Sequence, residues 1–333
     1  NTDVIIDMIA DLEKKDVNIA AFPELCITSY TMGDLFRQSE VLKQAEECLF
    51  KILSKTKSFK IISIIGMPII YQDKLFNVAA VIKFGKVLGI IPKAFIPNYS
   101  EYYEVRWFTG GGDIKNETFD LRGEQIPFGV DLLFECEEYK KFTFGVEVCE
   151  DLWAPFPPHA YQAMAGSFMC FNISASNELV GKADYRKEMV RHQSARYISC
   201  YTYVSAGCGE STTDTVFGGH ALLAENGKLL GETKRFSFEN EYAITEFDIE
   251  RLVHDRILRN TFDDEGERKE YRRISFSLEN DKVLPKYREM TKMPFVPYFD
   301  EDKTKRCEEV FDIQVTALSK RMKHAHINKL VIG

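Results

Sequence analysis

Short apolar runs alternate along this chain with segments whose apolar residues recur at helical spacing. At the start, Val4, Ile5, Met8, Ile9 and Leu12 mark one face of an amphipathic helix. Asn226-Gly227 is a strong hairpin turn signal, and Phe84-Gly85-Lys86 separates two further strands. We expect strands at 17–22, 61–70, 142–149, 168–176, 201–207 and 220–233, a two-stranded hairpin at 76–93, and helices at 36–56, 158–166, 184–198, 248–259 and 304–323.

The order of these elements predicts the α/β class. Several strands are apolar throughout, which is typical of a sheet covered by helices on one side and by another layer on the other. Residues 94–118 are irregular and rich in aromatic side chains, and residues 285–297 hold three prolines and read as an extended connector. A short strand at 328–333 is expected to end the chain.

Composition sets limits on the class of protein. With 333 residues, 45% of them hydrophobic, the chain can bury a core in one large domain or two modest ones. A net charge of −8 argues against a nucleic-acid surface. No apolar run approaches the roughly 20 residues of a membrane helix, so no membrane contact is expected. The first residue is not Met and the last strand ends at Gly333, so we expect segments before and after the sequence.

The eight cysteines are scattered and form no C-x-x-C pair. This spacing argues against a structural zinc site, and a disulfide framework is improbable in a chain of this length. We therefore expect a reducing, cytoplasmic compartment. His159, His192 and His220 are too dispersed for a metal cluster, so no metal site is predicted.

Three chemically complementary residues stand at or just past the ends of predicted strands. Glu24, Lys93 and Cys149 each stand between an apolar run and a loop, although any one of them alone reads as a surface or core residue. A thiol at a strand-to-helix junction can attack a carbonyl carbon, a carboxylate can carry the proton, and an ammonium can stabilise an oxyanion. Together they suit amide hydrolysis. Glu101 could orient Lys93, and Glu147 could act in the site or serve as a structural carboxylate.

The segments around these residues resemble those of a known superfamily. "FPEL", "IPKAFIPNYSEYYEVRWFTGG" and "GVEVCEDLW" are similar to the three signature segments of the nitrilase, or carbon–nitrogen hydrolase, superfamily. The resemblance implies a four-layer α-β-β-α sandwich with two sheets packed face to face. It also implies a catalytic triad of Glu24, Lys93 and Cys149, with Glu101 as the second glutamate.

Further segments resemble one branch of that superfamily. "NISASNELVGKADYR", "AGCGESTTDTVFGGHALL" and the late "RCEEVFDIQVTAL" are similar to the glutaminase domain of glutamine-dependent NAD synthetases. The resemblance implies a glutaminase domain at 1–262 and an extension at 263–333 that leads into an ATP-dependent synthetase domain absent from this sequence. It implies L-glutamine as substrate and a pocket lined by Tyr99, Glu150, Trp153, Ser176 and Lys182. Some members have arginine at the position of Lys182.

The resemblance also implies a mechanism and partners. Glu24 would deprotonate Cys149 for attack on the side-chain amide, while Lys93 and the backbone N–H of Glu150 hold the oxyanion. Ammonia would pass through a tunnel to the chain's own synthetase domain, which converts deamido-NAD to NAD. No cofactor is expected here, ATP and Mg only in the synthetase domain, and the protein should form a homo-oligomer.

Two other functions remain open from the sequence. One is a stand-alone amidase of the same superfamily that acts on another small amide. The other is a non-catalytic binding or scaffold domain that keeps a relic of the site, which the intact set of Glu24, Lys93 and Cys149 disfavours.

Overall fold

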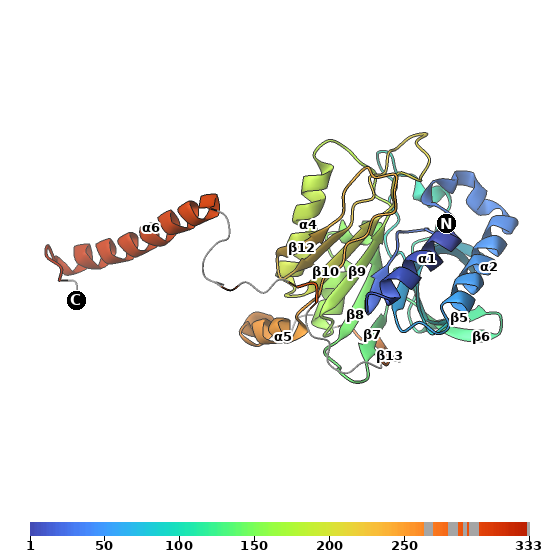
Figure 1. The fold of residues 1–333 in the computed structure, drawn as a ribbon, viewed down its shortest axis with the longest axis horizontal. Helices are drawn as coiled ribbons and strands as arrows, with labels where there is room; N and C mark the ends of the chain where they lie inside the picture. The colour runs from blue at the N-terminus through green and yellow to red at the C-terminus, as the bar shows by residue number, and fades with distance from the viewer. Residues whose placement is uncertain (263–268, 279–285, 289–291, 293–299, 332–333) are drawn as a thin grey trace. The chain divides into compact units, whose positions relative to one another are not determined.

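The described part of the chain forms two compact units. The computed structural model describes residues 1–262, 269–278, 286–288, 292 and 300–331, and divides the chain into Asn1–Lys286 and Tyr287–Gly333 (Figure 1). The first unit continues past residue 262, where the sequence placed the domain boundary, because strand β13 (Arg272–Phe276) pairs with β7 (Leu132–Cys136). In the second unit the described element is helix α6 (Asp300–Ala325).

The first unit is built on two β-sheets. One has six strands, in the order β1 (Ile19–Ala21), β2 (Ile62–Tyr71), β3 (Lys74–Lys83), β4 (Lys86–Pro92), β6 (Glu124–Phe128) and β5 (Glu117–Leu121). The other has seven, in the order β12 (Lys228–Glu232), β11 (Leu222–Glu225), β10 (Cys200–Ser205), β9 (Met169–Ser174), β8 (Thr143–Val148), β7 and β13. Both sheets mix parallel and antiparallel pairs.

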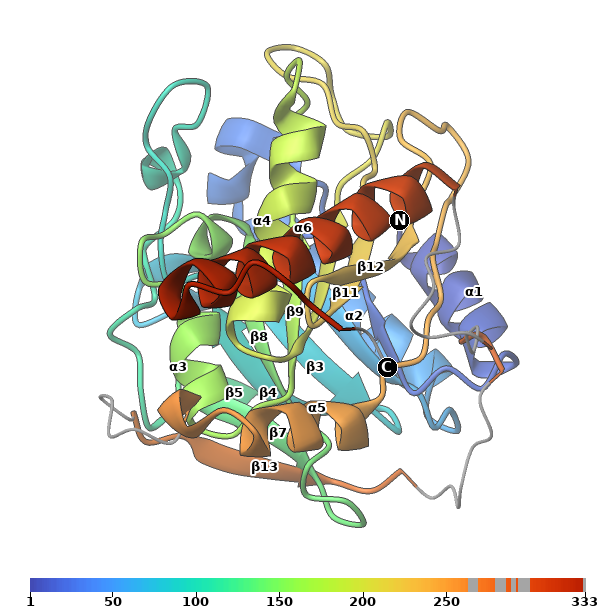
Figure 2. The same cartoon turned by 90° about the vertical axis from the view of Figure 1, so that its left-hand side faces the viewer.

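Helices cover the outer faces of both sheets. Helices α1 (Thr2–Glu13) and α2 (Ser39–Lys55) lie on the first sheet, as Figure 1 shows. Helices α3 (Pro158–Met164) and α4 (Lys182–Arg196) lie on the second sheet, and α5 (Ile249–Ile257) follows β12 (Figure 2). The unit also contains four short 3₁₀ segments among its described residues: η1 (Tyr30–Arg37), η2 (Glu104–Arg106), η3 (Cys149–Leu152) and η4 (Asn260–Phe262).

Three apolar cores separate these layers. Alternation along β3 shows how they arise, because Val78 and Ala80 face the core beneath α1 and α2 while Ala79 and Val81 face the second sheet. A third core lies between the second sheet and α4, where Val190 packs against strand residues. Helix, sheet, sheet and helix are therefore stacked, which confirms the predicted α-β-β-α sandwich.

The structure corrects two expectations about elements. Residues 328–331 form no strand; the rest of the predicted segment, residues 332–333, lies outside the described residues, as does most of the connector at 285–297. A strand needs a neighbour to complete its hydrogen bonds, and the described part of the second unit offers only a helix. Strands β5, β6, β7 and β13 were not expected. β5, β6 and β13 are partly polar and lack a continuous apolar run, and β7 is only five residues long.

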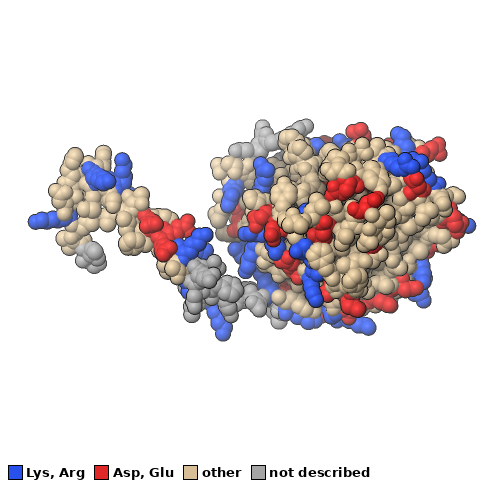
Figure 3. Space-filling view, turned by 90° about the horizontal axis from the view of Figure 1, so that it is seen from above, with Lys and Arg blue, Asp and Glu red and all other residues tan. Residues whose placement is uncertain are grey.

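The surface is mixed in charge. Figure 3 shows acidic and basic side chains interspersed over the first unit on the face in view. Within the described parts of the chain, no helix has the length and apolar character needed to cross a membrane.

Candidate active site

Three strand ends bring the predicted triad together. Glu24 follows β1, Lys93 follows β4, and Cys149 begins η3 directly after β8. All three side chains are buried. The backbone N–H of Glu24 donates to the carbonyl of Ser174, at the end of β9, over 3.2 Å. This bond joins the turn of the first sheet to the sheet that carries Cys149.

The ammonium of Lys93 lies between two carboxylates. Its Nζ is 2.7 Å from Glu24 Oε1 and 2.9 and 2.8 Å from the two oxygens of Glu104. Asn77 donates to Glu24 Oε1 over 2.6 Å, and the hydroxyl of Tyr30 donates to Glu104 Oε1 over 2.7 Å. Glu24 Oε2 is buried and has no hydrogen-bond partner among the described residues. This oxygen can therefore accept a proton from a group in the site.

Burial and the neighbouring charges fix the charge states. Burial opposes the ammonium of Lys93, but Glu104 and Glu24 outweigh it and raise the pKa of Lys93 well above its usual value. Burial also raises the pKa of Glu104 to about 7, against the attraction of Lys93. Burial raises the pKa of the Cys149 thiol; Glu24 raises it further and Lys93 lowers it. Both charges therefore lie close enough to act on the thiol, and burial favours its neutral form.

The backbone of Cys149 has a left-handed conformation. Its φ is 46°, a value that residues with a Cβ rarely adopt and that persists where surrounding contacts hold it. Asp151 supplies such contacts, because its carboxylate accepts from the backbone N–H groups of Val148 at 2.9 Å, Ala94 at 3.1 Å and Phe95 at 2.9 Å. The turn after β8 is thus tied to the loop that follows Lys93.

Glu147 belongs to the support beneath this turn. Its carboxylate accepts from the backbone N–H of His159 at 3.0 Å, from Asn172 Nδ2 at 3.3 Å and from the hydroxyl of Tyr201. Asn172 Nδ2 also lies 3.4 Å from the carbonyl of Cys149. Of the two alternatives left open by the sequence, the contacts favour the structural carboxylate.

Glu101 does not make the contact with Lys93 that the sequence suggested. Its Oε1 accepts from Asn177 Nδ2 at 2.6 Å, and Glu104 binds Lys93 instead. The physical reason is the 3₁₀ turn η2, which begins at Glu104 and places this side chain in the interior. Both glutamates lie in "SEYYEVRW", and spacing from Lys93 could not tell them apart. Asn77 and Tyr30 were missed because nothing in the sequence marks them.

The residues predicted to line a glutamine pocket form two pairs, and a fifth residue lies apart from both. The hydroxyl of Tyr99 lies 3.0 and 2.9 Å from the two carboxylate oxygens of Glu150, the residue after Cys149. Lys182 Nζ lies 6.0 Å from the ring centroid of Trp153. The fifth residue, Ser176, presents its hydroxyl to a guanidinium nitrogen of Arg186 at 3.4 Å.

Two further residues of this region were missed by the sequence. Lys182 donates to the hydroxyl of Tyr102 at 3.0 Å and to Asn177 Oδ1, and Tyr102 itself donates to Asn177 Oδ1 at 2.6 Å. Burial lowers the pKa of Lys182, and a charge on Cys149 would raise it. Lys182 therefore lies within electrostatic reach of the thiol.

The described residues offer no site for a metal. No group of three or more His, Cys, Asp or Glu side chains in the described ranges is arranged to hold an ion. All eight cysteines are free thiols.

The chain is similar in sequence to a known protein family over most of its length. The model of the carbon–nitrogen hydrolase family matches residues 1–256. The chain belongs to the carbon–nitrogen hydrolase family. The resemblance inferred from the three signature segments is thereby confirmed, and the chain has the fold of this family of enzymes.

Curated relatives of this chain are named glutamine-dependent NAD(+) synthetases. The glutamine-dependent NAD(+) synthetase of Mycobacterium tuberculosis is 34% identical over 339 residues, which cover all of this chain and 50% of that protein. A protein of the same name from Mycobacterium leprae is 35% identical over 326 residues, covering 95% of this chain and 47% of that protein. The chain thus spans about half the length of the curated relatives it matches.

Solved structures show the same likeness. A glutamine-dependent NAD(+) synthetase from Cytophaga hutchinsonii superposes with a TM-score of 0.65 at 30% identity, covering 73% of this chain and 39% of that one. A carbon–nitrogen hydrolase from Helicobacter pylori superposes with a TM-score of 0.58 at 17% identity, covering 79% of this chain and 89% of that one. At that identity the second likeness concerns the fold alone.

Proposed function

We propose that this chain is the glutamine amidohydrolase part of a glutamine-dependent NAD synthetase, and that it supplies ammonia. One observation carries the chemistry: the Cys149 thiol shares a buried site with Lys93 and with Glu24, which keeps one carboxylate oxygen unpartnered. The names of the relatives, at 34–35% identity over nearly the whole chain, support glutamine as the amide.

The first half of the reaction forms a thioester. Glu24 takes the thiol proton of Cys149, and the thiolate attacks the side-chain amide carbon of glutamine. The ammonium of Lys93 and the backbone N–H of Glu150 stabilise the oxyanion of the tetrahedral intermediate. The C–N bond breaks, and Glu24 returns its proton to the departing nitrogen, so that ammonia leaves and a γ-glutamyl thioester remains.

The second half releases glutamate. Glu24, again ionised, takes a proton from a water molecule that attacks the thioester carbon. The C–S bond breaks, glutamate leaves, and the proton held by Glu24 returns to the thiolate. Lys93 keeps its charge throughout, because Glu24 and Glu104 raise its pKa well above the usual value despite burial.

Polar side chains near the thiol would suit the polar end of glutamine. Lys182 is the cation that would bind the α-carboxylate, as a point charge rather than in the bidentate way of arginine. Tyr99 and Glu150 would accept hydrogen bonds from the α-ammonium. Trp153 and Ser176 would line the rest of the substrate site. Glu104, which holds Lys93, takes the role that the sequence assigned to Glu101.

The wider setting is proposed on the same grounds. The other half of the relatives' length would hold a synthetase domain that uses ATP and Mg and receives the ammonia through a tunnel. A homo-oligomer in the cytoplasm remains the expectation for the whole protein.

The test is the release of ammonia and glutamate from L-glutamine. We expect Cys149→Ala to reduce the rate by at least about a thousandfold, the scale expected for loss of a nucleophile. Cys307→Ala is the matched control, because Cys307 is exposed on α6, and its rate should equal that of the parent chain. Equal rates for Cys149→Ala and the parent would overturn the proposal, and so would hydrolysis of other small amides with none of glutamine.

A further inference from the structure

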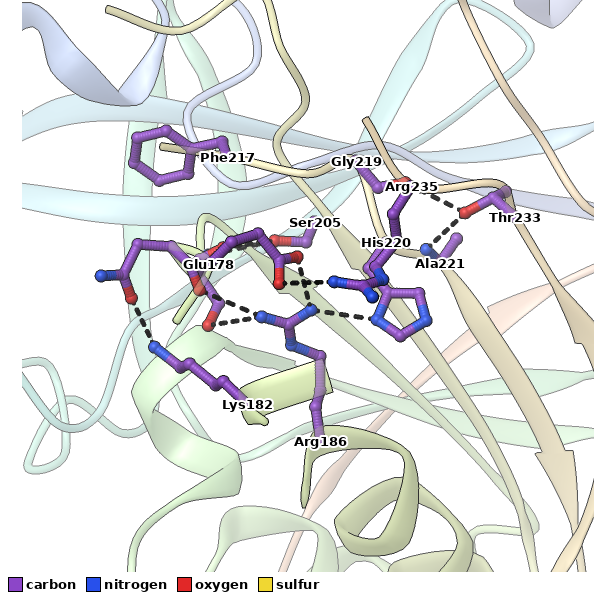
Figure 4. A network of polar contacts seen from close by, with 12 residues as sticks. Glu178, Lys182, Arg186, Ser205, Phe217, Gly219, His220, Ala221, Thr233 and Arg235 are labelled. Atoms are coloured by element: carbon purple, nitrogen blue, oxygen red, sulfur yellow. Dashed lines mark hydrogen bonds and ion pairs between the residues drawn. The ribbon is translucent and has the colours of Figure 1, made fainter. Parts of the chain in front are cut away.

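A buried arginine lies behind the pocket lysine on the same helix. Arg186 follows Lys182 by one turn of α4, and its side chain is fully buried. Figure 4 shows its guanidinium between Glu178 and His220, with Lys182 nearby. One guanidinium nitrogen lies 2.9 Å from Glu178 Oε1 and 3.0 Å from His220 Nδ1. The second terminal nitrogen lies 3.4 Å from Ser176 Oγ and 3.1 Å from the carbonyl of Asn177.

Asn177 connects this arginine to the pocket. Its backbone carbonyl accepts from Arg186, while its side-chain oxygen accepts from Lys182 and Tyr102. The position of the Asn177 backbone therefore determines where its side-chain oxygen lies, and that oxygen holds the ammonium of Lys182. Arg186 is therefore connected to Lys182 through Asn177 alone, and it can influence Lys182 without touching a substrate.

The guanidinium is itself held from behind. Glu178, which binds Arg186, also pairs with Arg235 at 3.1 Å, and its backbone N–H donates to the carbonyl of Val216 at 2.7 Å. A Cβ on Gly218 would lie 2.5 Å from Glu178 Oε1. The absence of a side chain at Gly218 therefore lets its backbone approach the carboxylate of Glu178 closely. Glu178 therefore fixes one edge of the guanidinium.

His220 fixes another edge. Because Arg186 can only donate, His220 Nδ1 must accept, which leaves Nε2–H to donate to Glu232 at 3.0 Å. Glu232 also pairs with Lys187, at 2.8 Å, on the same helix as Arg186. The guanidinium plane is thus defined by groups from two separate segments, residues 176–178 and His220, and a flexible lysine chain could not replace it.

We propose that Arg186 is a positioning residue that sets the affinity for glutamine by fixing Asn177 and, through it, Lys182. This inference rests on the proposed glutaminase function. It separates two parts of the site: the triad carries the bond chemistry, and the Arg186 network holds the cation for the α-carboxylate. Lysine at position 186 would keep the charge but lose the planar fork that serves four acceptors at once.

The experiment measures KM and kcat for glutamine in Arg186→Lys. We expect KM to rise by about tenfold or more, the scale of one lost hydrogen bond to a charged group, with kcat within about twofold of the parent. Arg191→Lys is the matched control on the same helix, since Arg191 is exposed and binds Glu188 and the carbonyl of Gly227. Its KM should not change.

A second readout separates positioning from general damage. Alkylation of Cys149 by iodoacetamide, which has no α-carboxylate, should proceed at the parent rate in Arg186→Lys. In a Lys182→Met background, Arg186→Lys should add less than about a twofold further rise in KM, because the residue through which it acts is gone. A full additional tenfold rise there, an unchanged KM in the single variant, or equal losses of kcat and kcat/KM would overturn the inference.

The outcomes distinguish this inference from the proposed function. If the parent chain releases no ammonia from glutamine, the glutaminase proposal fails. If the parent hydrolyses glutamine and Arg186→Lys keeps its KM, only the inference fails. Should Arg186→Lys not fold, judged by its thermal unfolding, Glu178→Gln provides the test, because it removes the carboxylate partner and should raise KM in the same way.

Discussion

At the scale of single residues, the site depends on buried groups whose neighbours decide their charge. Glu24, Lys93 and Cys149 could be predicted from the sequence because each stands at or just past the end of an apolar strand. Glu104 could not be told from Glu101, since the choice depends on a single 3₁₀ turn. Arg186 and Asn177 carry no sequence signal of their own, because their contacts join segments that meet only in the folded chain.

Burial of His159 predicts a specific pH dependence of stability. Burial, with a smaller effect of Arg256, lowers the pKa of His159 to about 3, and its Nε2 contacts Ser199 Oγ at 2.9 Å. The unfolded chain binds a proton at this residue below its usual pKa of 6.5 and the native chain does not. The stability that neutral His159 contributes is therefore present above pH 6.5 and lost as the pH falls toward 3.

Urea unfolding of His159→Gln at several pH values tests this. The stability advantage of the parent over the variant should shrink by about 2 kcal/mol between pH 6.5 and 5, at about 1.4 kcal/mol per pH unit. His192→Gln, at an exposed position of α4, is the control and should show a constant difference. A constant difference for His159→Gln as well would contradict the assignment of a buried, neutral histidine.

At the scale of elements, the apolar runs predicted most strands of both sheets and missed β5, β6, β7 and β13. β2, β3, β8 and β9 are apolar and buried along most of their length, so their periodicity is clear. Three of the five residues of β5 are exposed and only Leu121 is buried, so no apolar run marks this strand. The strand predicted at 328–333 shows the converse, because its described part, residues 328–331, has no neighbouring strand and forms none.

Gly66, on strand β2, packs directly against the turn that contains Glu24, and this contact leads to a prediction. A Cβ at this position would lie 2.4 Å from the backbone nitrogen of Leu25, 2.5 Å from the carbonyl oxygen of Pro23 and 2.8 Å from the carbonyl carbon of Glu24. Backbone atoms cannot move aside as a flexible side chain can. Gly66→Ala should therefore destabilise the fold by about 1–3 kcal/mol and displace Glu24, which lowers kcat.

Chemical denaturation and glutamine turnover of the same variant provide the measurement. Gly209→Ala is the matched control, because a Cβ at Gly209 meets nothing within 4 Å. Parent-like stability and kcat in Gly66→Ala would show that the Glu24 turn can shift without consequence, contrary to the geometry described above.

At the scale of the whole first unit, face-to-face packing of two sheets creates the site. Glu24 and Lys93 come from one sheet and Cys149 from the other, and the bond from the Glu24 N–H to Ser174 joins the two. Periodicity alone predicts an α/β protein. The four layers were expected only because "FPEL", the lysine segment and "GVEVCEDLW" resemble a family, since sheet order depends on contacts between distant segments.

The most direct test of the account is to find the acyl group on the protein. The chain is mixed with L-glutamine, quenched in acid, digested and analysed by mass spectrometry. The account predicts a γ-glutamyl group on the peptide that contains Cys149 and none in Cys149→Ala or Glu24→Gln, which lack the nucleophile and its base. A γ-glutamyl group on another residue, or turnover of glutamine that persists in Cys149→Ala, would contradict it.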